Sequence, residues 1–461
     1  MANPDARFDS DGLLQSMARL PQTRLFWVGF SGGADSSALL HALHKNRDAL
    51  QAPIHAVHFH HGLHPSADSW QQHCRNFCRE RDISFTSRKL EIKRANRTSI
   101  EEESRNCRYL AIGEMLQRND IYLTAHHADD QAETLFLNLM RGSGIEGLAG
   151  IPELRNLGKG WVARPLLNTR RSELENYLIR HGIDWLEDPS NRDPSFDRNF
   201  LRNCLFPQLE TRWPGVVQRL TRTSRTARMS VTALADFIDI HCDELLHNRH
   251  RMPLRPFLQL EPPMRALVLR QWLRRQEIPA LPEVRLNEFI QQIAGSTSSS
   301  QAEVRWGGWQ IKLYGNLIWL QDQVIPTLES CKDWTVGSKM KLNDSLGCLQ
   351  LYGSKITIPG GWRVTSRRKG KRIRLHDQGV RRKLKDLFRE SAIPPWLRSS
   401  IPVLYWDGEA VAIGDWIFAH RLQNWLDTHA VEYRWEPGLP LLSELRSACH
   451  NLTVDHCQSL G

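Results

Sequence analysis

The sequence predicts an N-terminal α/β domain built on a parallel sheet, then a mainly helical domain and a small α+β domain. Three observations support this prediction. From about Arg24 to Glu133, short β-rich runs alternate with amphipathic segments, as in a parallel sheet wrapped by helices. A helical, proline-punctuated stretch follows, and beyond Asp322 short alternating runs return. With 461 residues, the chain has room for about three domains of roughly 150 residues.

The first domain is expected to contain strands and helices in the order of βαβ crossovers. The predicted strands are LFWVGF, IHAVHF, ISFTSRKL and IYLTAH, which begin at residues 25, 54, 83 and 121. The predicted helices between them lie near Ser36 to Lys45, Asp68 to Arg81 and Thr98 to Arg118.

Two further helices should close this domain, from about Arg171 to His181 and from about Arg198 to Thr211. The polar loop EDPSNRDPS lies between them, and its prolines predict an absence of regular structure. We therefore place the first domain at residues 1–215, the helical domain at 216–325, the α+β domain at 326–437 and a tail without a usable motif at 438–461.

The composition indicates a globular protein with a polyanionic partner. Apolar residues make up 41% and charged residues 24% of the chain, and the net charge of +10 favours nucleic acid. We expect no export and no membrane span, because the N-terminus is acidic and no run approaches about 18 apolar residues. The odd count of nine cysteines favours reduced thiols, so we expect a cytoplasmic protein.

The first predicted strand runs directly into the segment SGGADS, which has the features of a phosphate-binding loop. Its residues are Ser31, Gly32, Gly33, Ala34, Asp35 and Ser36. The glycines allow backbone amides to close around a phosphate, and the helix that follows adds the partial positive charge of its N-terminus. A Walker A sequence does not occur, which disfavours a P-loop hydrolase.

A histidine-rich segment, HFHHGLHPSADSW, follows the second strand. Its histidines are compatible with a metal site, although no cysteine or carboxylate with zinc spacing accompanies them. A nucleotide or RNA contact through His60 or His61 and a solvated loop are the other interpretations.

Charged groups also gather near the third and fourth strands. Arg105 and Arg108 share one helical face and can reach a phosphate together, although a salt-bridged surface helix has the same pattern. After the fourth strand, His126 precedes a helix start that carries Asp130 and Glu133 three residues apart. Two carboxylates on one face form a suitable receptor for the ammonium groups of an amino acid.

SGGADS resembles the SGGxDS signature of the PP-loop ATP pyrophosphatase superfamily, whose fold is adenine nucleotide alpha hydrolase-like. A set of stretches over about residues 20 to 435 resembles, in order, the tRNA(Ile)-lysidine synthetase family. These stretches are SGGADS, HFHHGLHPSADS, EEESRNCRY, TAHHADDQAETLFLNLMRGSGIEGLAGI, RPLL, EDPSNRDPSFDRNFLR and RRKLKDLFRESAIPPWLRSSIPVLYWDGEAVAIGDWIFAHR.

The resemblance implies an ATP-dependent ligase that acts on the isoleucine tRNA with a CAU anticodon. AMP would be placed on the wobble cytidine and then displaced by L-lysine, so that the tRNA reads AUA. Ser31 to Ser36 and Arg108 would bind ATP, and Asp35 would hold Mg²⁺. Asp35, His126, Asp130 and Glu133 would be catalytic, with Asp130 and Glu133 recognising lysine.

A dense basic block in the third domain is predicted to bind RNA phosphates, and the resemblance implies the same role for Arg198 of the first domain. Its residues are Arg367, Arg368, Lys369, Lys371, Arg372, Arg381, Arg382, Lys383 and Lys385. A solvated charged face is the alternative interpretation. Trp362, Trp396 and Trp406 are expected to be core residues rather than base-stacking platforms.

Other functions remain compatible with parts of this pattern. A PP-loop enzyme that thiolates a tRNA base would share the ATP loop, but it usually calls for CxxC pairs or a persulfide-bearing cysteine. A PP-loop amide or nucleotide synthetase would lack the basic third domain. A nucleotide-gated RNA-binding protein would leave Asp35, Asp130 and Glu133 without a role. The sequence does not determine the oligomeric state, and a homodimer is compatible with it.

Overall fold

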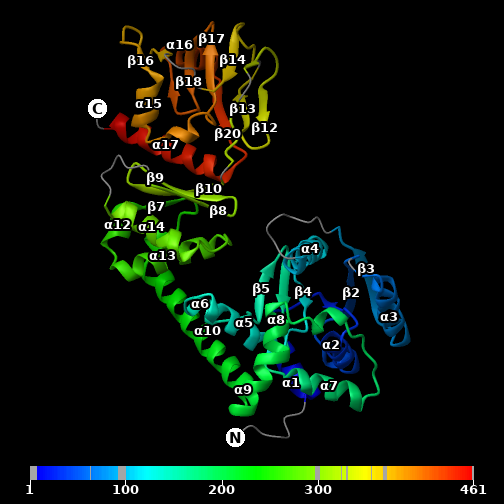
Figure 1. The fold of residues 1–461 in the computed structure, drawn as a ribbon. Helices are drawn as coiled ribbons and strands as arrows, with labels where there is room; N and C mark the ends of the chain where they lie inside the picture. Colours follow the sequence, from blue (N-terminus) through cyan, green and yellow to red (C-terminus); the bar gives the residue numbers. More distant parts are fainter. Residues whose placement is uncertain are drawn as a thin grey trace. The chain divides into compact units, whose positions relative to one another are not determined.

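The structure is a computed structural model that describes residues 8–62, 64–91, 100–295, 302–322, 324–328, 331–354, 356–366 and 371–458. The chain divides into two compact units, Met1–Leu234 and Ala235–Gly461, and each unit is described on its own (Figure 1). None of the helices in the described ranges combines the length and the apolar character that a membrane crossing requires.

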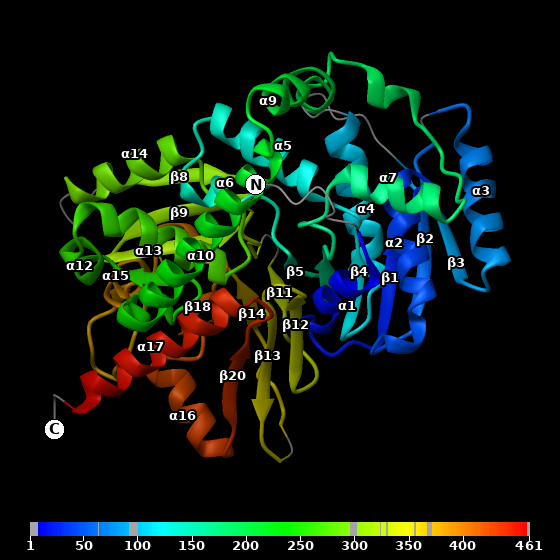
Figure 2. The same cartoon turned by 90° about the horizontal axis from the view of Figure 1, so that it is seen from below.

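The first unit contains a six-stranded sheet in the order β3-β2-β1-β4-β6-β5, which can be followed in Figure 2. The strands are β1 (Leu25–Gly29), β2 (Ile54–His60), β3 (Ser84–Lys89), β4 (Asp120–Leu123), β5 (Leu154–Leu157) and β6 (Gly160–Ala163). All neighbours pair in parallel except β5, which forms an antiparallel hairpin with β6. The predicted α/β domain with a parallel sheet is confirmed.

Helices cover both faces of this sheet. They are α1 (Ser10–Ala18), α2 (Ala34–Lys45), α3 (Ala67–Glu80), α4 (Ile100–Met115) and α7 (Arg171–Arg180). Two more helices, α5 (Ala128–Met140) and α6 (Ile145–Leu148), follow β4, and α5 packs in a separate small core. Phe26 and Val28 of β1 belong to a core with residues of α2, α3 and α7, whereas Trp27 packs on the opposite side with the core that includes Ile112 of α4. Alternate residues of one strand therefore hold helices on both faces.

The end of this unit differs from the sequence prediction. The loop expected to be irregular contains a short 3₁₀ helix, η2 (Pro189–Arg192). The single helix expected at 198–211 is three pieces: α8 (Asp197–Phe200), a π-helical turn η3 (Leu201–Leu205) and α9 (Phe206–Arg212). The first residues of the helix expected from Thr98 lie outside the described residues, and α4 begins at Ile100.

The long helix α10 (Val216–His241) contains the division between the units. Beyond it lie α11 (Asp243–Leu246), α12 (Leu254–Gln259), α13 (Pro262–Arg275) and α14 (Glu283–Ala294). The sequence reading omitted a four-stranded sheet in this helical region, which has the order β7-β10-β9-β8. Its strands are antiparallel and comprise β7 (Arg251–Pro253), β8 (Glu303–Trp306), β9 (Trp309–Tyr314) and β10 (Leu317–Asp322).

The last part of the chain is α+β, as predicted. One sheet comprises β11 (Lys332–Asp333), β14 (Trp362–Thr365), β17 (Val403–Trp406), β18 (Glu409–Ile413) and β19 (Ile417–Phe418). Two smaller sheets comprise β12 (Lys339–Asn343), β13 (Gly347–Tyr352) and β20 (Glu432–Glu436), and β15 (Arg372–Ile373) with β16 (Arg382–Lys383). The helices are α15 (Leu384–Glu390), α16 (His420–His429) and α17 (Pro440–Gln458).

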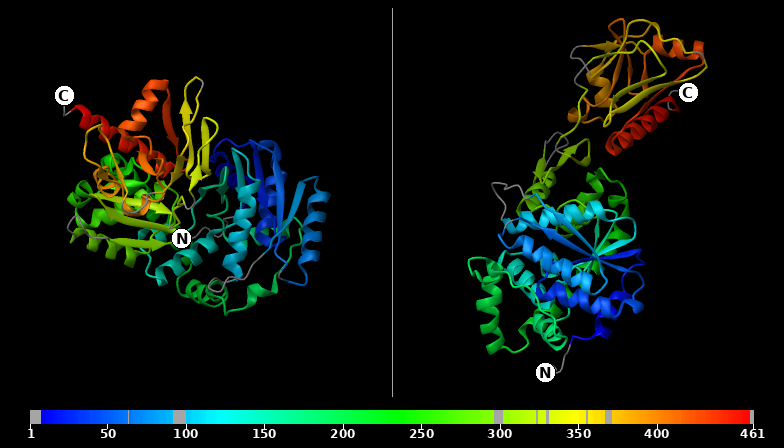
Figure 3. Two further views of the ribbon diagram at one scale, coloured as in Figure 1. Left: turned by 90° about the horizontal axis from the view of Figure 1, so that it is seen from above. Right: turned by 90° about the vertical axis from the view of Figure 1, so that its right-hand side faces the viewer.

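Tryptophans dominate the core of this α+β part. Trp362 is 1% exposed and packs edge-on against Trp334 and Trp406, while Trp396 and Trp406 lie partly buried at the margin of the same core. The prediction that these tryptophans are core residues is confirmed for Trp362. The tail forms α17, which lies beside the antiparallel strands of its own unit and contributes Leu442 to their core (Figure 3).

Candidate active site

The loop between β1 and α2 is shaped by hydrogen bonds among its own serines and glycines. The Ser31 hydroxyl lies 3.0 Å from that of Ser36, and the Ser36 hydroxyl donates to the Gly33 carbonyl at 3.0 Å. The first amides of α2 have no partner within the helix and are available to an anion. The predicted phosphate-binding geometry therefore lies at the carboxyl end of β1.

Gly32 is required by the backbone of this loop. Its φ is +84°, and a Cβ placed on it would lie 2.7 Å from Cδ1 of Leu186. The Gly32 carbonyl accepts a 2.8 Å hydrogen bond from the Leu186 amide, which fastens the loop to the segment after α7. A residue with a side chain would be strained in this conformation and would also crowd Leu186.

His127 joins this loop to the segment after β4. It is 1% exposed and precedes α5, where its amide donates to Oδ2 of Asp130 at 3.0 Å. Its Nε2 atom lies 3.6 Å from Oδ2 of Asp35 and 3.5 Å from Oδ2 of Asp130. Asp35 and Asp130 therefore belong to one site, although they come from different βα turns.

The charges around His127 shift several pKa values. Burial alone would lower the pKa of His127, but Asp130, Asp35 and Asp129 together raise it to about 9. Burial would likewise raise the pKa of Asp130, yet His127, His126 and Arg202 hold it well below its usual range. These shifts favour a protonated His127 beside an ionised Asp130 at neutral pH.

His126 has the opposite character. Burial lowers its pKa to about 3, assisted by Arg164, Arg105 and Arg108 and opposed by Asp130. One ring nitrogen, Nδ1, lies 2.7 Å from the Thr124 hydroxyl. Neighbouring histidines are thus held in different protonation states, and His126 is neutral at neutral pH.

Arg202 closes the site over the two predicted lysine-binding carboxylates. It donates to Glu133 at 2.8 and 3.1 Å and to Asp130 at 3.0 Å. The Glu133 side chain has no exposed surface, and burial raises its pKa despite the neighbouring Arg202. Leu201 and Phe206 pack with Ala128 and Ala132 of α5, which holds Arg202 above these carboxylates.

Asp129 faces the start of α7. It accepts a hydrogen bond from the Arg171 amide at 2.8 Å and forms an ion pair with Arg170 at 3.0 Å. Arg170 also pairs with Glu210 of α9 at 3.0 Å.

We refer to Asp35, Asp129, Asp130 and Glu133 as the carboxylate cluster. Its four carboxylates face His127, Arg170 and Arg202, and because Arg170 is shared with Glu210, the cluster retains negative charge.

An arginine cluster, defined as Arg105, Arg108, Arg155 and Arg164, surrounds Tyr109. Arg164 is 3% exposed and donates to the Tyr109 hydroxyl at 3.3 Å, and the Arg155 guanidinium lies 4.7 Å from the ring centroid. Burial would raise the pKa of Tyr109, but Arg164, Arg105 and Arg108 lower it. Among the described residues, Arg105 and Arg108 form no ion pair, so this cluster is suited to an anion.

The remaining predicted site residues are Arg198, whose charge acts on Glu133 of the carboxylate cluster, and the basic block of the second unit. Arg198 of α8 donates to the Thr134 hydroxyl at 3.1 Å. In the predicted basic block, Arg381 pairs with Glu409 at 2.5 Å and Arg382 pairs with Glu390.

Lys371, the first described residue of the basic block, donates to the Gly408 carbonyl at 3.1 Å. Arg372, Lys383 and Lys385 are exposed and form no ion pair with any residue that the structure describes. Arg367, Arg368 and Lys369 lie outside the described residues.

The histidines after β2 have separate partners. His58 bonds the Phe30 carbonyl, His60 lies 3.0 Å from Asp68, and His61 lies 2.7 Å from the Ser104 hydroxyl. Over the described ranges, no group of three or more His, Cys, Asp or Glu side chains is arranged for a metal ion.

Sequence reasoning did not assign roles to Arg202, Arg170 or Tyr109. A signal for Arg202 existed, since it follows Arg198 by four residues in the stretch DRNFLR and thus has a similar helical position. No comparable signal marked Arg170 or Tyr109, because their partners are 41 and 55 residues away in the chain.

Three family models match successive parts of this chain, and the first of them includes the phosphate loop. Residues 9–209 match the family model of a PP-loop domain, residues 252–319 that of the TilS substrate binding domain, and residues 362–435 that of the TilS substrate C-terminal domain. The PP-loop domain implies that the chain binds ATP.

Curated relatives cover most of the chain. A tRNA(Ile)-lysidine synthase of Xanthomonas campestris pv. campestris is 32% identical over 90% of this chain and 95% of its own length. Proteins of the same name from Proteus mirabilis and Legionella pneumophila are 31% and 33% identical over 84% of this chain, and over 89% and 90% of their own lengths.

Among solved structures, the U34-tRNA thiolase NcsA from Methanococcus maripaludis matches with a TM-score of 0.40 and 16% identity over 48% of this chain and 78% of its own. The identity to the curated relatives, sustained over nearly the full chain, shows that this protein is an enzyme of the tRNA(Ile)-lysidine synthase family.

Proposed function

We propose that the enzyme ligates L-lysine to the wobble cytidine of the isoleucine tRNA with a CAU anticodon, using ATP. The products are lysidine, AMP and pyrophosphate, and the reaction takes place in the cytoplasm. The observation that carries this proposal is the position of His127, which lies within 3.6 Å of both Asp35 in the phosphate loop and Asp130 at the start of α5. A nucleotide site and a site for a cationic substrate therefore adjoin.

The phosphate loop is proposed to bind ATP together with Mg²⁺. Oδ1 of Asp35 is buried and accepts no hydrogen bond from the described residues, so this oxygen is available to a hard cation. Asp35 would hold the ion, which would offset the charge of the phosphates. The Ser31 and Ser36 hydroxyls and the amides at the start of α2 would bind the phosphate oxygens.

The carboxylate cluster is proposed to recognise lysine. Its residual negative charge favours a substrate that carries two ammonium groups. Asp130 is the better candidate for direct contact, because it remains partly exposed while the Glu133 side chain is fully buried under Arg202. Glu133 would then act by orienting Arg202 and, through it, Asp130.

The chemistry requires two displacements. The cytidine O2 attacks the α-phosphorus of ATP and pyrophosphate leaves; the unprotonated side-chain amine of lysine then attacks C2 of the ring and AMP leaves. His126 is neutral at neutral pH and can therefore accept a hydrogen bond beside Asp130. The arginine cluster, including Arg108, would stabilise negative charge on the phosphates and the RNA.

The direct test is incubation of the purified enzyme with ATP, lysine and a transcript of this tRNA. We expect nucleoside mass spectrometry to detect cytidine that carries one lysine, with one AMP released per modified base. Omission of ATP should abolish the product. Formation of AMP with a thiolated base would support the rival thiolation activity, and binding of tRNA without AMP would support a non-catalytic protein.

Replacement of Asp130 by Asn tests the lysine site. The change removes one negative charge with little change in volume, so we expect the KM for lysine to rise by about tenfold or more while the affinity for ATP changes little. A variant of the exposed Asp48 provides the matched control, because within the described part of the chain Asp48 pairs only with Arg47. An unchanged KM for lysine in Asp130→Asn would refute the assignment.

A further inference from the structure

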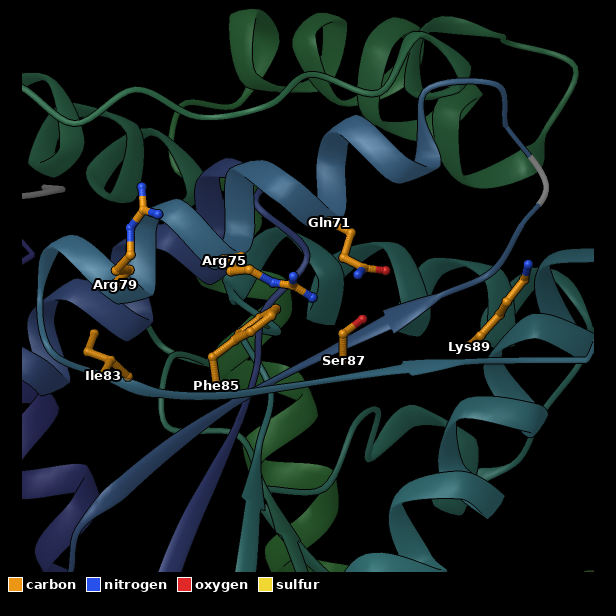
Figure 4. A pocket seen from close by; sticks show the side chains of 7 residues that line it. All are labelled: Gln71, Arg75, Arg79, Ile83, Phe85, Ser87 and Lys89. Atoms are coloured by element: carbon orange, nitrogen blue, oxygen red, sulfur yellow. The ribbon is translucent and has the colours of Figure 1, made fainter.

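A groove lies on the outer edge of the N-terminal sheet, between α3 and the edge strand β3 (Figure 4). Its volume is about 600 Å³. Its polar lining comprises Gln71, Arg75 and Arg79 from α3 and Ser87 and Lys89 from β3, and Phe85 forms its floor. The groove is separate from the residues assigned to ATP and lysine.

The local structure explains why these side chains face one another. Gln71, Arg75 and Arg79 follow one another at intervals of four residues and therefore form a stripe along one face of α3. Phe85, Ser87 and Lys89 alternate along β3 and point to the same side of the sheet. Figure 4 shows Ser87 directed from the strand toward the helix and Gln71 directed from the helix toward the strand.

The cations that line the groove have no carboxylate partner among the described residues, whereas their neighbours do. Arg81 pairs with Glu80 at 3.3 Å, and Arg88 pairs with Glu114 at 2.7 Å. In contrast, Arg75, Arg79 and Lys89 are exposed and pair with no carboxylate among the residues that the structure describes. The unneutralised positive charge of this edge is therefore concentrated in the groove.

The two carboxylates of α3 contact side chains that do not line the groove. Asp68, at the start of α3, lies 3.0 Å from His60, and Glu80 is engaged by Arg81. The side chains of Gln71 and Ser87 form no hydrogen bond with the described residues, so they are available as further donors. Three cations and two neutral donors along a groove form a pattern suited to successive phosphate groups.

The groove also begins at the edge of the sheet where the candidate active site lies. Lys89 is opposite His60 in the register of β3 and β2, and both residues are at the carboxyl ends of their strands. Because β1, β2 and β3 are parallel, this end is also the end at which β1 enters the phosphate loop. A polymer bound at the carboxyl edge could continue along the groove past Arg75 to Arg79.

We propose that this groove binds the sugar-phosphate backbone of the tRNA, alongside the nucleotide that enters the active site. The proposal rests on the proposed tRNA substrate. Arg75, Arg79 and Lys89 bind phosphate oxygens, and Gln71 and Ser87 donate hydrogen bonds to the same backbone. The exposed edge of Phe85 provides an apolar floor for a ribose or a base.

The test is a triple variant, Arg75→Gln/Arg79→Gln/Lys89→Gln, with its affinity for tRNA measured at several salt concentrations. The matched control is Arg19→Gln/Arg118→Gln/Lys159→Gln, which removes the same charge from exposed residues that precede β1, β4 and β6. These residues lie toward the amino ends of the strands and outside the groove. Circular dichroism and thermal unfolding would verify that both variants are folded.

The groove variant should bind tRNA at least about tenfold more weakly near 0.1 M salt, and the slope of log Kd against log salt should fall by about 2 to 3. The control variant should lose much less of its affinity for tRNA, and its salt slope should change less. The KM for lysine and the affinity for ATP should be unchanged in both variants, because neither alters the carboxylate cluster or the phosphate loop.

The proposal would be overturned if the groove variant kept the wild-type affinity for tRNA and the wild-type salt slope. It would also be overturned if the control variant lost as much affinity as the groove variant. The result is independent of the proposed reaction. If the wild-type enzyme forms no lysidine, the proposed function fails, yet the binding measurements still decide whether the groove holds RNA. If lysidine forms and groove-variant binding is unchanged, only the groove proposal fails.

Discussion

The most informative residue of the site is His127, because its side chain has different neighbours from those of the adjacent His126. His127 lies against Asp35, Asp129 and Asp130, whereas the pKa of His126 is set mainly by burial, which Asp130 opposes and three arginines assist. Two adjacent imidazoles thus have pKa values of about 9 and about 3. Environment, rather than residue type, decides which of them carries a proton.

This difference leads to a prediction about stability and pH. Since the pKa of His127 rises from 6.5 to about 9 on folding, its protonation stabilises the folded protein fully below pH 6.5. That contribution, on the order of 3 kcal/mol, is lost as the pH rises through about 9. The variant His127→Asn should therefore be less stable than wild type at pH 6, and the difference should shrink by pH 9.5.

Urea unfolding of both proteins at pH 6, 7.5 and 9.5 would measure this difference. Titrating groups remote from His127 are common to both proteins, so the pH dependence of the difference reports on His127 together with the carboxylates that it contacts. A difference in unfolding free energy that is constant over this range would show that the imidazolium does not stabilise the fold.

At the scale of elements, two short irregular segments place the reactive groups. The loop at Gly32 lets β1 turn into α2 with free amides at the helix start. The π-helical turn η3 interrupts what would otherwise be a regular helix and carries Arg202 to Glu133. Such turns are frequent at functional sites, because an extra residue re-aims the side chains beside it.

Gly32→Ala should destabilise the protein, and Gly33→Ala should not. Gly32 has a φ of +84°, whereas Gly33 has a φ of −75° and a Cβ there would meet the Ser31 hydroxyl at 3.4 Å and the Leu186 carbonyl oxygen at 3.9 Å, both ordinary contacts. We expect Gly32→Ala to lose about 1–3 kcal/mol of unfolding free energy, measured by urea or thermal unfolding. Equal stability of the two variants would contradict the strained role assigned to Gly32.

At the scale of the whole molecule, positive charge occurs in both compact units. The first unit carries the arginine cluster and the groove beside β3, and the second carries the basic block near β16 and α15. Part of that block is already neutralised, because Arg381 and Arg382 pair with Glu409 and Glu390. Lys383 and Lys385 keep an exposed charge without an ion pair among the described residues.

Lys383→Gln/Lys385→Gln should weaken tRNA binding and lower the salt slope by about 1 to 2. The matched variant Arg381→Gln/Arg382→Gln should lose less affinity for tRNA, because the arginines that it replaces already have carboxylate partners. Filter binding at several salt concentrations would measure both. An equal loss in the two variants would indicate that the ion pairs break when tRNA binds.

The sequence by itself determined the parallel α/β domain, the phosphate loop and the sets of polar residues after β1 and β4. Each of these depends on neighbouring residues: alternation along a strand, glycines at a turn, or carboxylates three apart on a helix. The sequence did not predict the sheet of β7 to β10, because its short strands lie within and after a mainly helical region.

Only the tertiary structure decided how these groups act together. It placed Arg202 on Glu133, 69 residues earlier in the chain, and brought His127 between Asp35 and Asp130. It also left Arg75, Arg79 and Lys89 along one groove without a carboxylate partner in the described ranges, while providing partners for their neighbours. The physical reason is that ion pairing and burial depend on distances between separate elements, which local sequence patterns do not specify.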